Sequence, residues 1–277
     1  MNREMNKRKH GTVLLVLTLF LLTCAGCGQQ ENLWEKSAAG ERGQWVERES
    51  GVGTASPQDE TAVGNVIIAP LLEWEDLETE NLAGMLQDTC GGMMVQLTAG
   101  GFMGSGVIYL ADENCLVIVT ARHVLESAAE AVQITFADGW ETETVDFSLS
   151  WLADLAILKV PLREIPAQRL EKYMTANVDK VSCDSLQAGD GCIVMGSRSG
   201  VAEDAYEGTV LDAWIYMEDY GQYMIWVKAA GKPGMSGGGL FDRRGHLLGI
   251  LSGRSEDGEW AVVPLALLWA ELPDTDG

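Results

Sequence analysis

The chain has 277 residues, 47% of them hydrophobic, which is enough chain to enclose a sizeable apolar core. Its formal net charge is −22 at pH 7, and this surplus of carboxylates repels phosphates, which argues against a nucleic-acid partner. The same charge favours basic or unfolded protein segments as partners, or serves only to keep the protein soluble outside a cell.

The first 27 residues have the features of an export signal. A basic start is formed by four side chains, Arg3, Lys7, Arg8 and Lys9. The apolar run Thr12 to Leu22 is too short to span a bilayer comfortably. It ends in Cys24-Ala25-Gly26-Cys27, which resembles the lipobox of bacterial lipoproteins and predicts lipidation of Cys27. We expect a protein at the outer face of the cell membrane or a secreted one; a plain signal peptide, an uncleaved anchor and a Cys24–Cys27 redox pair are the alternatives.

The next segment, residues 28–64, is rich in Gln, Glu, Gly, Ser and Ala and lacks hydrophobic periodicity. Such a composition predicts a flexible tether between the membrane and the folded part. From Leu71 to Gln87, apolar residues recur with roughly helical spacing among acidic ones, which predicts a short helix or an irregular cover.

Short apolar runs separated by turn residues then follow in two sets of six. The first set comprises residues 93–99, 106–110, 116–120, 132–136, 142–149 and 155–160. The second comprises residues 191–195, 208–213, 224–229, 238–241, 247–251 and 260–263. This pattern predicts an all-β fold with two six-stranded antiparallel β-barrels, residues 65–165 and 166–277, whose joint falls within 161–178. Ala137-Asp138-Gly139 predicts a hairpin inside the first barrel.

One histidine is a candidate general base. The chain has three histidines, and His10 lies in the leader. His246 follows the polar turn 242–245, so we expect it to be exposed at the start of a strand. His123 instead lies where a β-rich run changes to a helical turn, a good position for a catalytic side chain.

A carboxylate and a serine complete the candidate site. Asp154 has apolar neighbours on both sides, so its charge needs a strong donor such as an imidazole N–H, and Asp146 is the fallback. Ser236 lies in Gly234-Met235-Ser236-Gly237-Gly238-Gly239, where a nucleophilic hydroxyl and backbone N–H donors share one tight turn. The order His, Asp, Ser predicts a serine hydrolase. A core histidine and a turn aspartate are the structural alternatives.

These segments resemble the chymotrypsin-fold (trypsin-like) serine proteases, and within them the Deg/HtrA-like branch of bacterial extracytoplasmic proteases. The likeness covers about residues 93–268 and is carried by Gly104-Ser105-Gly106, Thr120-Ala121-Arg122-His123, Ala153-Asp154-Leu155 and the Ser236 turn. Because the chain ends soon after Leu268, we expect no PDZ module, which many relatives carry there. Relatives often assemble as trimers, and the sequence leaves an oligomer open.

The resemblance implies that Ser236 attacks the scissile carbonyl, His123 transfers the proton and Asp154 orients the imidazole, in a cleft between the barrels. The oxyanion hole would consist of the N–H groups of Gly234 and Ser236, with that of Met235 as a flanking donor. Glycine at 234 is expected to take the positive φ that this arrangement needs.

The resemblance also places a substrate-binding pocket, with walls that include Ala230, Gly231, Ser252 and Gly253. Small neutral walls predict an apolar, small-to-medium substrate side chain, and residues 252–254 are expected to pair with the substrate backbone. Lys232 either narrows this pocket or points to solvent.

Three residues depart from the family pattern. Gly239 replaces a usual proline and is expected to loosen the chain after the nucleophile. Met235 replaces the aspartate that trypsin-like members pair with a newly cut N-terminus, so activation by clipping is not expected. Arg122 lies beside the base and either lowers the pKa of the imidazole or reaches toward substrate.

Two functional hypotheses follow. The first is a lipid-anchored serine endopeptidase that cleaves exported or misfolded proteins; the second is a catalytically silent relative that binds peptides as a sensor. The sequence holds no zinc-protease helix motif, phosphate loop or dinucleotide fingerprint, so we expect no metal and no cofactor. Four cysteines lie outside the leader, namely Cys90, Cys115, Cys183 and Cys192. Cys115 and Cys192 adjoin apolar strands and are interpreted as buried thiols, and disulfide bridges among the four remain open.

Overall fold

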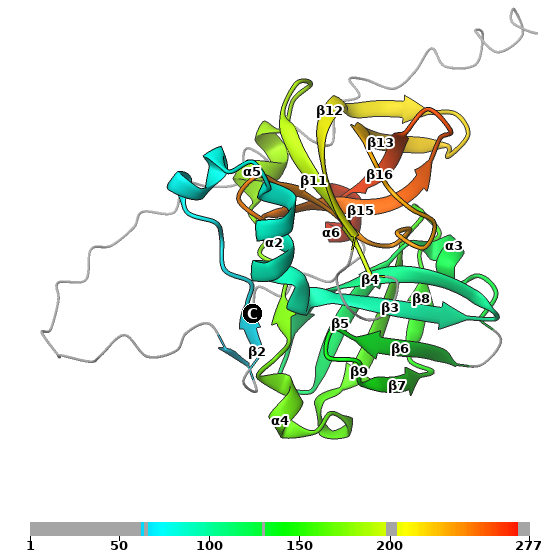
Figure 1. Cartoon of the computed structure of the whole chain (residues 1–277). Helices are drawn as coiled ribbons and strands as arrows, with labels where there is room; N and C mark the ends of the chain where they lie inside the picture. Colours follow the sequence, from blue (N-terminus) through cyan, green and yellow to red (C-terminus); the bar gives the residue numbers. More distant parts are fainter. Residues whose placement is uncertain (1–61, 64–65, 129–130, 198–203, 271–277) are drawn as a thin grey trace, which may run out of the picture. The chain divides into compact units, whose positions relative to one another are not determined.

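A computed structural model of the chain describes residues 62–63, 66–128, 131–197 and 204–270 (Figure 1). These residues belong to one compact unit, 57–277. The predicted signal peptide, its Cys27 and all of the predicted tether except Ala62–Val63 lie outside them. No helix within the described ranges combines the length and apolar character needed to cross a membrane.

The first described segments form a cover over the β-structure. They are β1 Ala62–Val63, β2 Val66–Ile68, η1 Trp74–Glu78, α2 Leu82–Cys90 and η2 Gly91–Met93. The α2 helix begins where the Asn81 side chain accepts a hydrogen bond from the Gly84 N–H (3.2 Å), and it buries Leu82 and Leu86. The helical cover predicted for 71–87 is therefore confirmed.

The first sheet has seven strands in the order β7-β6-β3-β4-β5-β9-β8, all antiparallel to their neighbours. Their bounds are β3 Met94–Ala99, β4 Phe102–Ala111, β5 Cys115–Thr120, β6 Val132–Phe136, β7 Glu141–Thr144, β8 Phe147–Leu149 and β9 Ala156–Pro161. The predicted hairpin at 137–139 is present, with Gly139 at φ 77° in its turn.

The seventh strand corrects the predicted count of six. The run expected as one strand, 142–149, bends at Val145–Asp146, so that β7 pairs with β6 and β8 pairs with β9 at the opposite edge. The Lys159 N–H donates to the Asp146 carbonyl at the bend (2.9 Å), and the Thr144 hydroxyl donates to the Lys159 carbonyl (2.8 Å). One continuous segment therefore links both edges of the sheet and curls it into a barrel-like shape.

The second sheet is a closed barrel with the strand order β11-β12-β13-β16-β15-β14. Its strands are β11 Gly191–Gly196, β12 Asp204–Met217, β13 Gln222–Ala229, β14 Gly239–Asp242, β15 Leu247–Arg254 and β16 Glu259–Pro264. A final helix, α6 Leu265–Trp269, follows. The predicted fold class, two antiparallel β-barrels, is confirmed.

The connection between the sheets contains four short elements: η3 Leu162–Glu164, α4 Ala167–Leu170, β10 Met174–Thr175 and α5 Lys180–Ser185. The strand β10 pairs in parallel with β2, so the N-terminal cover and the connection form one small sheet with β1. Residues 162–178 contain one strand of two residues, β10, as expected for the segment 161–178 with its prolines and charges.

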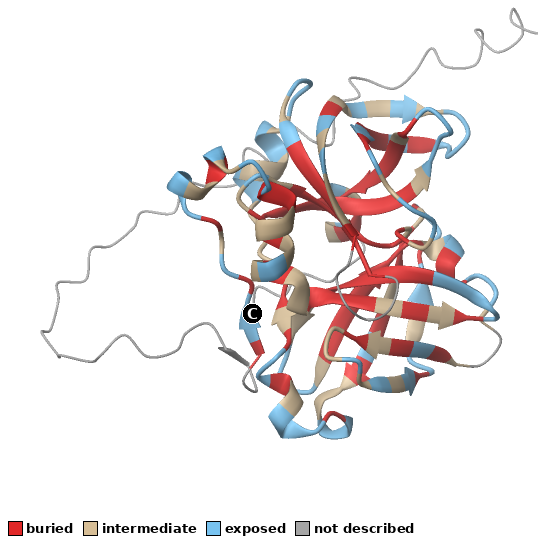
Figure 2. Ribbon diagram, in the orientation of Figure 1, coloured by how far each residue is buried: buried red, intermediate tan, exposed pale blue. Residues whose placement is uncertain are grey.

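Burial follows the strands of both sheets (Figure 2). In β9, for example, the buried residues alternate with half-buried or exposed ones, which is the period-2 pattern of a strand with one face on a core. The core of the first sheet includes the stacked rings of Phe136 and Tyr173, whose centroids are 4.4 Å apart. This alternation explains why the sequence predicted the strands.

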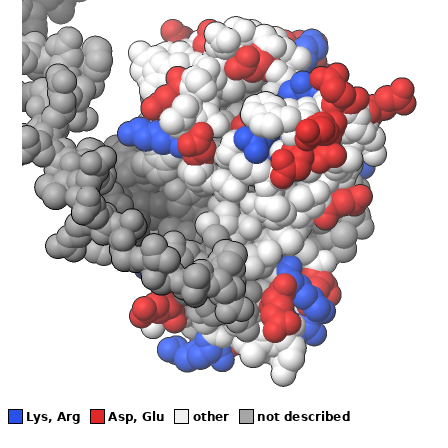
Figure 3. All heavy atoms as spheres, turned by 90° about the vertical axis from the view of Figure 1, so that its left-hand side faces the viewer, with Lys and Arg blue, Asp and Glu red and all other residues white. Residues whose placement is uncertain are grey.

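Most charged side chains of the described residues lie on the outside of these elements, and Asp204 is a buried exception. On the face drawn in Figure 3, acidic side chains gather over the upper part and basic ones are scattered among them. This is consistent with the net charge of −22, and the described residues visible on that face form no continuous basic surface.

Candidate active site

His123 and Asp154 form a hydrogen-bonded pair. The β5 strand ends at Thr120 and the one-turn helix α3, Arg122–Leu125, presents His123 beside the place where the two sheets meet (Figure 1). The His123 Nδ1 lies 2.9 Å from the Asp154 Oδ2, and the His123 backbone N–H donates to Oδ1 (3.0 Å). The carboxylate thus holds both the ring and the backbone of the histidine.

Asp154 receives a further hydrogen bond from the Ser252 hydroxyl on β15. Its side chain is 17% exposed, against 44% for that of His123. Burial raises the pKa of Asp154, but the hydrogen bonds from His123 and Ser252 outweigh burial and leave this pKa below its usual 3.8. The hydrogen bond to Asp154 raises the pKa of His123 above 6.5, against the opposite effect of burial.

Ser236 lies in a turn that both sheets hold. From the first sheet, the Ser105 N–H donates to the Ser236 carbonyl (2.7 Å). From the second, the Gly237 N–H donates to the Leu251 carbonyl (2.7 Å), and Leu251 precedes the Ser252 that bonds Asp154. Position 237 accepts only glycine, because φ is 84° and a Cβ there would lie 2.1 Å from the Ser105 carbonyl oxygen.

Gly104 packs against both the serine turn and the helical turn that carries His123. A Cβ on Gly104 would lie 3.0 Å from the Ser236 carbonyl oxygen and 2.6 Å from a methyl group of Val124, the residue after His123. Among the described residues, however, no hydrogen bond joins the His123 ring to the Ser236 hydroxyl. Such contacts often tighten only when substrate is bound.

The turn before Ser236 has the features of a type II turn. Pro233 occupies its second position, Gly234 takes φ 94° at the third, and the Met235 N–H donates to the Lys232 carbonyl (3.4 Å). The expected positive φ at Gly234 is confirmed. The expectation that the Met235 N–H is a flanking oxyanion donor is corrected, because this N–H is used inside the turn.

Ser105 fixes this turn from the first sheet. Its buried hydroxyl lies 2.7 Å from the Gly234 carbonyl oxygen, to which it donates, and it accepts from the Ser197 N–H (2.8 Å). Asp154 orients the imidazole of His123, and the glycine-rich turn places backbone N–H groups beside Ser236. An oriented base and a serine next to backbone donors are the groups that acyl transfer requires.

Comparison with known proteins agrees with this geometry. A model of the trypsin-like peptidase domain matches residues 104–250, which is more than half of the chain. The chain belongs to the trypsin-like peptidase family. The predicted family resemblance is thus confirmed.

Individual relatives of this peptidase chain are of the HtrA type. It is 31% identical over 166 residues to the serine protease Do-like HtrA of Lactobacillus helveticus (56% of this chain, 37% of the relative). It is 28% identical over 151 residues to the periplasmic serine endoprotease DegP of Escherichia coli K12 (53% and 29%). The chain thus spans about a third of the length of the curated relatives it matches.

Solved structures share the fold. The HtrA-type protease AlgW with tripeptide has a TM-score of 0.55 and 24% identity, over 68% of this chain and 61% of that one. The Rv3671c protease in an inactive form also has a TM-score of 0.55, with 16% identity, over 76% of this chain and all of that one (100%). At these identities, the likeness establishes the fold of this trypsin-like peptidase chain.

The residues predicted to line the substrate pocket of this peptidase surround two aromatic side chains. The buried Trp260 donates its indole N–H to the Ala230 carbonyl (3.3 Å), and a Cβ on Gly231 would lie 2.3 Å from its ring. The Tyr220 hydroxyl lies 2.2 Å from where a Cβ on Gly253 would be, next to Ser252. The sequence signalled neither aromatic residue, because each comes from a distant strand or loop.

An open hollow of about 550 Å³ adjoins the predicted pocket, and its lining includes Ala230 and Arg254. Ala230 is exposed there, whereas Ser252 is buried and directed to Asp154. Of the four predicted lining residues, Ser252 is therefore the one in direct contact with the candidate catalytic residues.

The three departures from the family pattern also have defined surroundings. Arg122 pairs with Glu126 (3.0 Å) and donates a hydrogen bond to the carbonyl of Ser150, four residues before Asp154 (2.8 Å). The pKa of His123 is raised, so the expectation that Arg122 lowers it is wrong. Gly239 does not loosen the chain, because it pairs with strands on both sides and a Cβ there would meet the Phe241 ring at 2.4 Å. Met235 is fully buried.

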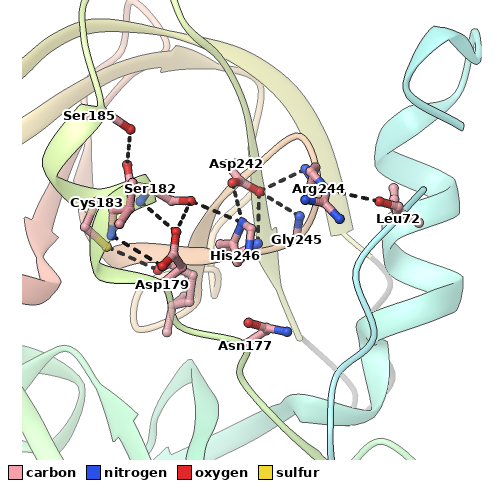
Figure 4. A network of polar contacts seen from close by, with 12 residues as sticks. Leu72, Asn177, Asp179, Ser182, Cys183, Ser185, Asp242, Arg244, Gly245 and His246 are labelled. Atoms are coloured by element: carbon pink, nitrogen blue, oxygen red, sulfur yellow. Dashed lines mark hydrogen bonds and ion pairs between the residues drawn. The ribbon is translucent and has the colours of Figure 1, made fainter. Parts of the chain in front are cut away.

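Lys232 is exposed, which agrees with the solvent-facing alternative, and its Nζ also lies 2.5 Å from the Asp204 Oδ1. The interpretation of His246 as exposed is wrong. His246 is buried, and its Nδ1 lies 2.6 Å from the Asp242 Oδ2 (Figure 4). The network in Figure 4 connects this histidine to Ser182 on α5, and through Arg244 the same turn reaches the Leu72 carbonyl, so it joins the second barrel to the connection and to the N-terminal cover.

The cysteines outside the leader are free thiols in the described part of the chain. Cys90 and Cys192 are buried, and burial raises the pKa of each thiol to about 12, which leaves them unreactive. Cys115 is only half-buried, which corrects the expectation of a buried thiol there.

Proposed function

We propose that the chain is a serine endopeptidase that works through an acyl-enzyme on Ser236. The observation that carries the proposal is the hydrogen-bonded pair of His123 and Asp154 beside the turn that holds Ser236. A carboxylate on Nδ1 leaves Nε2 free of the proton, so Nε2 can accept the proton of the serine hydroxyl.

In the first half of the reaction, the Ser236 oxygen attacks the scissile carbonyl carbon and His123 Nε2 takes the serine proton. The imidazolium formed is stabilised by Asp154, whose lowered pKa keeps it ionised. His123 then gives the proton to the leaving amine as the peptide C–N bond breaks. Water, deprotonated by His123, releases the acyl group in the second half.

The oxyanion of the tetrahedral intermediate is bound by the backbone N–H groups of Gly234 and Ser236. The positive φ of Gly234 and the hydrogen bond from Ser105 to the Gly234 carbonyl support this assignment. A single preorganised donor of this kind is typically worth about 3–4 kcal/mol of barrier.

The substrates are exported or misfolded proteins, bound by residues that include Ala230, Gly231, Ser252 and Gly253. The periplasmic location printed for DegP supports an extracytoplasmic site of action. Cys27, preceded by small residues, supports a lipid anchor on the outer face of the membrane. Palmitate labelling of the full chain in its cell, expected in wild type and lost in Cys27→Ser, tests the anchor.

A catalytically silent, peptide-binding protein is the second candidate. The missing hydrogen bond between His123 and Ser236 among the described residues favours it. A fluorophosphonate probe separates the two candidates, because only an activated serine is phosphonylated rapidly. We expect labelling of wild type, none of Ser236→Ala and unchanged labelling of the matched control Ser148→Ala, which alters an exposed serine on β8. Folded wild type that does not label would refute the endopeptidase and leave the silent protein.

A further inference from the structure

An ion pair between an exposed lysine and a buried carboxylate lies at the start of the turn Lys232–Met235, which precedes Ser236. Lys232 is two residues before Gly234, and its Nζ is 2.5 Å from the Oδ1 of Asp204, the first residue of β12. The carboxylate side chain is completely buried (0% exposed), whereas the lysine side chain is 47% exposed. The pair therefore ties a surface loop to a fixed point inside the second barrel.

The chemistry of this pair keeps the lysine in place. A buried carboxylate is costly unless cations and donors compensate its charge, and breaking such a pair by removing one partner is strongly unfavourable. The Tyr206 hydroxyl donates to the same Oδ1 (3.1 Å), and the Tyr206 ring lies 5.8 Å from the ammonium. The hydrogen bond to Asp204 raises the pKa of Lys232, so the ammonium is charged at neutral pH.

The clamped residue is also the first residue of the turn that orients Gly234. The Lys232 carbonyl accepts the Met235 N–H that closes this turn (3.4 Å). Met235 is itself buried against Gly196, where a Cβ would lie 2.8 Å from the methionine side chain. Gly196 and Asp204 are directly paired residues of β11 and β12. The first residue of the turn, Lys232, therefore contacts one member of this pair, and the last, Met235, contacts the other.

The orientation of one peptide group depends on this arrangement. The Gly234 N–H belongs to the central peptide of the turn, between Pro233 and Gly234, and a rotation of that peptide would turn the N–H away. Ser105 holds the following peptide through the Gly234 carbonyl (2.7 Å). At the other end of the turn, Lys232 is held by its ion pair with Asp204 and by the hydrogen bond from its N–H to the Met235 Sδ (3.3 Å).

We propose that the Asp204–Lys232 ion pair is a positioning device that keeps the Gly234 N–H aimed at the oxyanion. This inference rests on the proposed endopeptidase function. Lys232 touches neither the reacting atoms nor the base; it acts through the turn. Removing the Lys232 ammonium therefore weakens binding of the oxyanion and leaves binding of the ground-state substrate unchanged.

Two peptide ligands of identical sequence test this difference. One ends in a trifluoromethyl ketone, which forms a hemiketal oxyanion on Ser236, and the other in the corresponding alcohol, which forms none. For Lys232→Met we expect the ketone to bind at least about tenfold more weakly and the alcohol to change by less than about twofold. In peptide hydrolysis, kcat should fall while KM stays constant.

The controls use the same chain. Lys232→Arg keeps the charge and should retain ketone affinity within about threefold, and Lys180→Met removes an exposed lysine from α5 and should change nothing. Circular dichroism and thermal melting check the fold of each variant. If Lys232→Met does not fold, Lys232→Gln, which keeps a donor towards Asp204 without its charge, is measured with the same expectation.

The outcomes are separable. Wild type that labels at Ser236, together with Lys232→Met that loses ketone and alcohol equally or loses neither, would overturn the positioning role and leave the endopeptidase intact. Wild type that neither labels nor binds the ketone would overturn the proposed function and this inference with it.

Discussion

Replacing Asp154 by asparagine exchanges one carboxylate oxygen for an NH₂ group and tests the whole proposed mechanism. The carboxylate accepts the His123 backbone N–H on Oδ1 (3.0 Å) and the ring Nδ1 on Oδ2 (2.9 Å), together with the Ser252 hydroxyl. The asparagine side chain must place its NH₂ group on one of these two sides. A backbone N–H cannot become an acceptor, so the NH₂ group faces the ring and the Ser252 hydroxyl.

The imidazole then accepts at Nδ1 and carries its proton on Nε2, the nitrogen that must take the serine proton. The wrong tautomer, together with the lost charge opposite the imidazolium, should lower kcat by about 10⁴-fold, the effect of the equivalent change in a related serine protease. At 1.36 kcal/mol per factor of ten, this is about 5 kcal/mol of transition-state stabilisation. Substrate affinity should change little, because Asp154 makes no contact with substrate.

The assay is steady-state hydrolysis of a peptide together with the rate of fluorophosphonate labelling. Asp146→Asn is the matched control, because Asp146 is an exposed carboxylate at the bend between β7 and β8 and should retain full activity. Asp154→Asn with a kcat close to that of wild type, in a folded protein, would show that the reasoning about the tautomer is wrong. Equal losses in both variants would point to a general electrostatic effect instead.

Three further outcomes are expected. The acid limb of kcat/KM should have its midpoint above pH 6.5, because Asp154 raises the pKa of His123 and only the neutral imidazole acts as a base; a pH–rate profile measures this. Gly237→Ala should lower the melting temperature more than Gly221→Ala does. Both positions have positive φ, so each alanine should destabilise the fold by about 1–2 kcal/mol through its left-handed backbone. At position 237 the Cβ would also clash with the Ser105 carbonyl oxygen, whereas at position 221 it would meet no atom within 4 Å. Phe136→Ala should cost about 3–5 kcal/mol in the free energy of unfolding in denaturant titrations, because the ring is fully buried and stacked on another aromatic ring.

The strands were predictable because the signal is local. Period-2 burial and turn residues lie within a few positions of each other, so each of the two predicted sets matches strands of one sheet. The split of 142–149 into β7 and β8 was not predictable, because it depends on pairing with β6 and β9 at opposite edges. The local pattern reports a strand and does not report which neighbour it has.

The two side-chain interpretations fell short for different reasons. His246 looked exposed because it follows a polar turn, yet it is buried and pairs with Asp242 of that same turn. Lys232 is exposed, but the sequence did not indicate that its ammonium meets a buried carboxylate. For Lys232, that carboxylate is Asp204, 28 residues away in the chain. Trp260 was missed as a neighbour of Ala230 for the same reason. A contact between residues of two strands leaves no trace in the sequence near either one.

The candidate site itself depends on contacts that cross between the two sheets. The base and the carboxylate follow or precede strands of the first sheet, whereas the serine turn precedes a strand of the second. Three hydrogen bonds connect these parts: from Ser105 to the Ser236 carbonyl, from Ser105 to the Gly234 carbonyl and from Ser252 to Asp154. These hydrogen bonds act together with a hydrophobic cluster shared by both sheets, which includes Val107 of β4 and Ile250 of β15, and a shift of one sheet against the other would separate His123 from the serine. We therefore expect changes at Ser105 or Ser252 to alter the reaction rate more than the free energy of unfolding, because these two residues set the distance between the halves of the site.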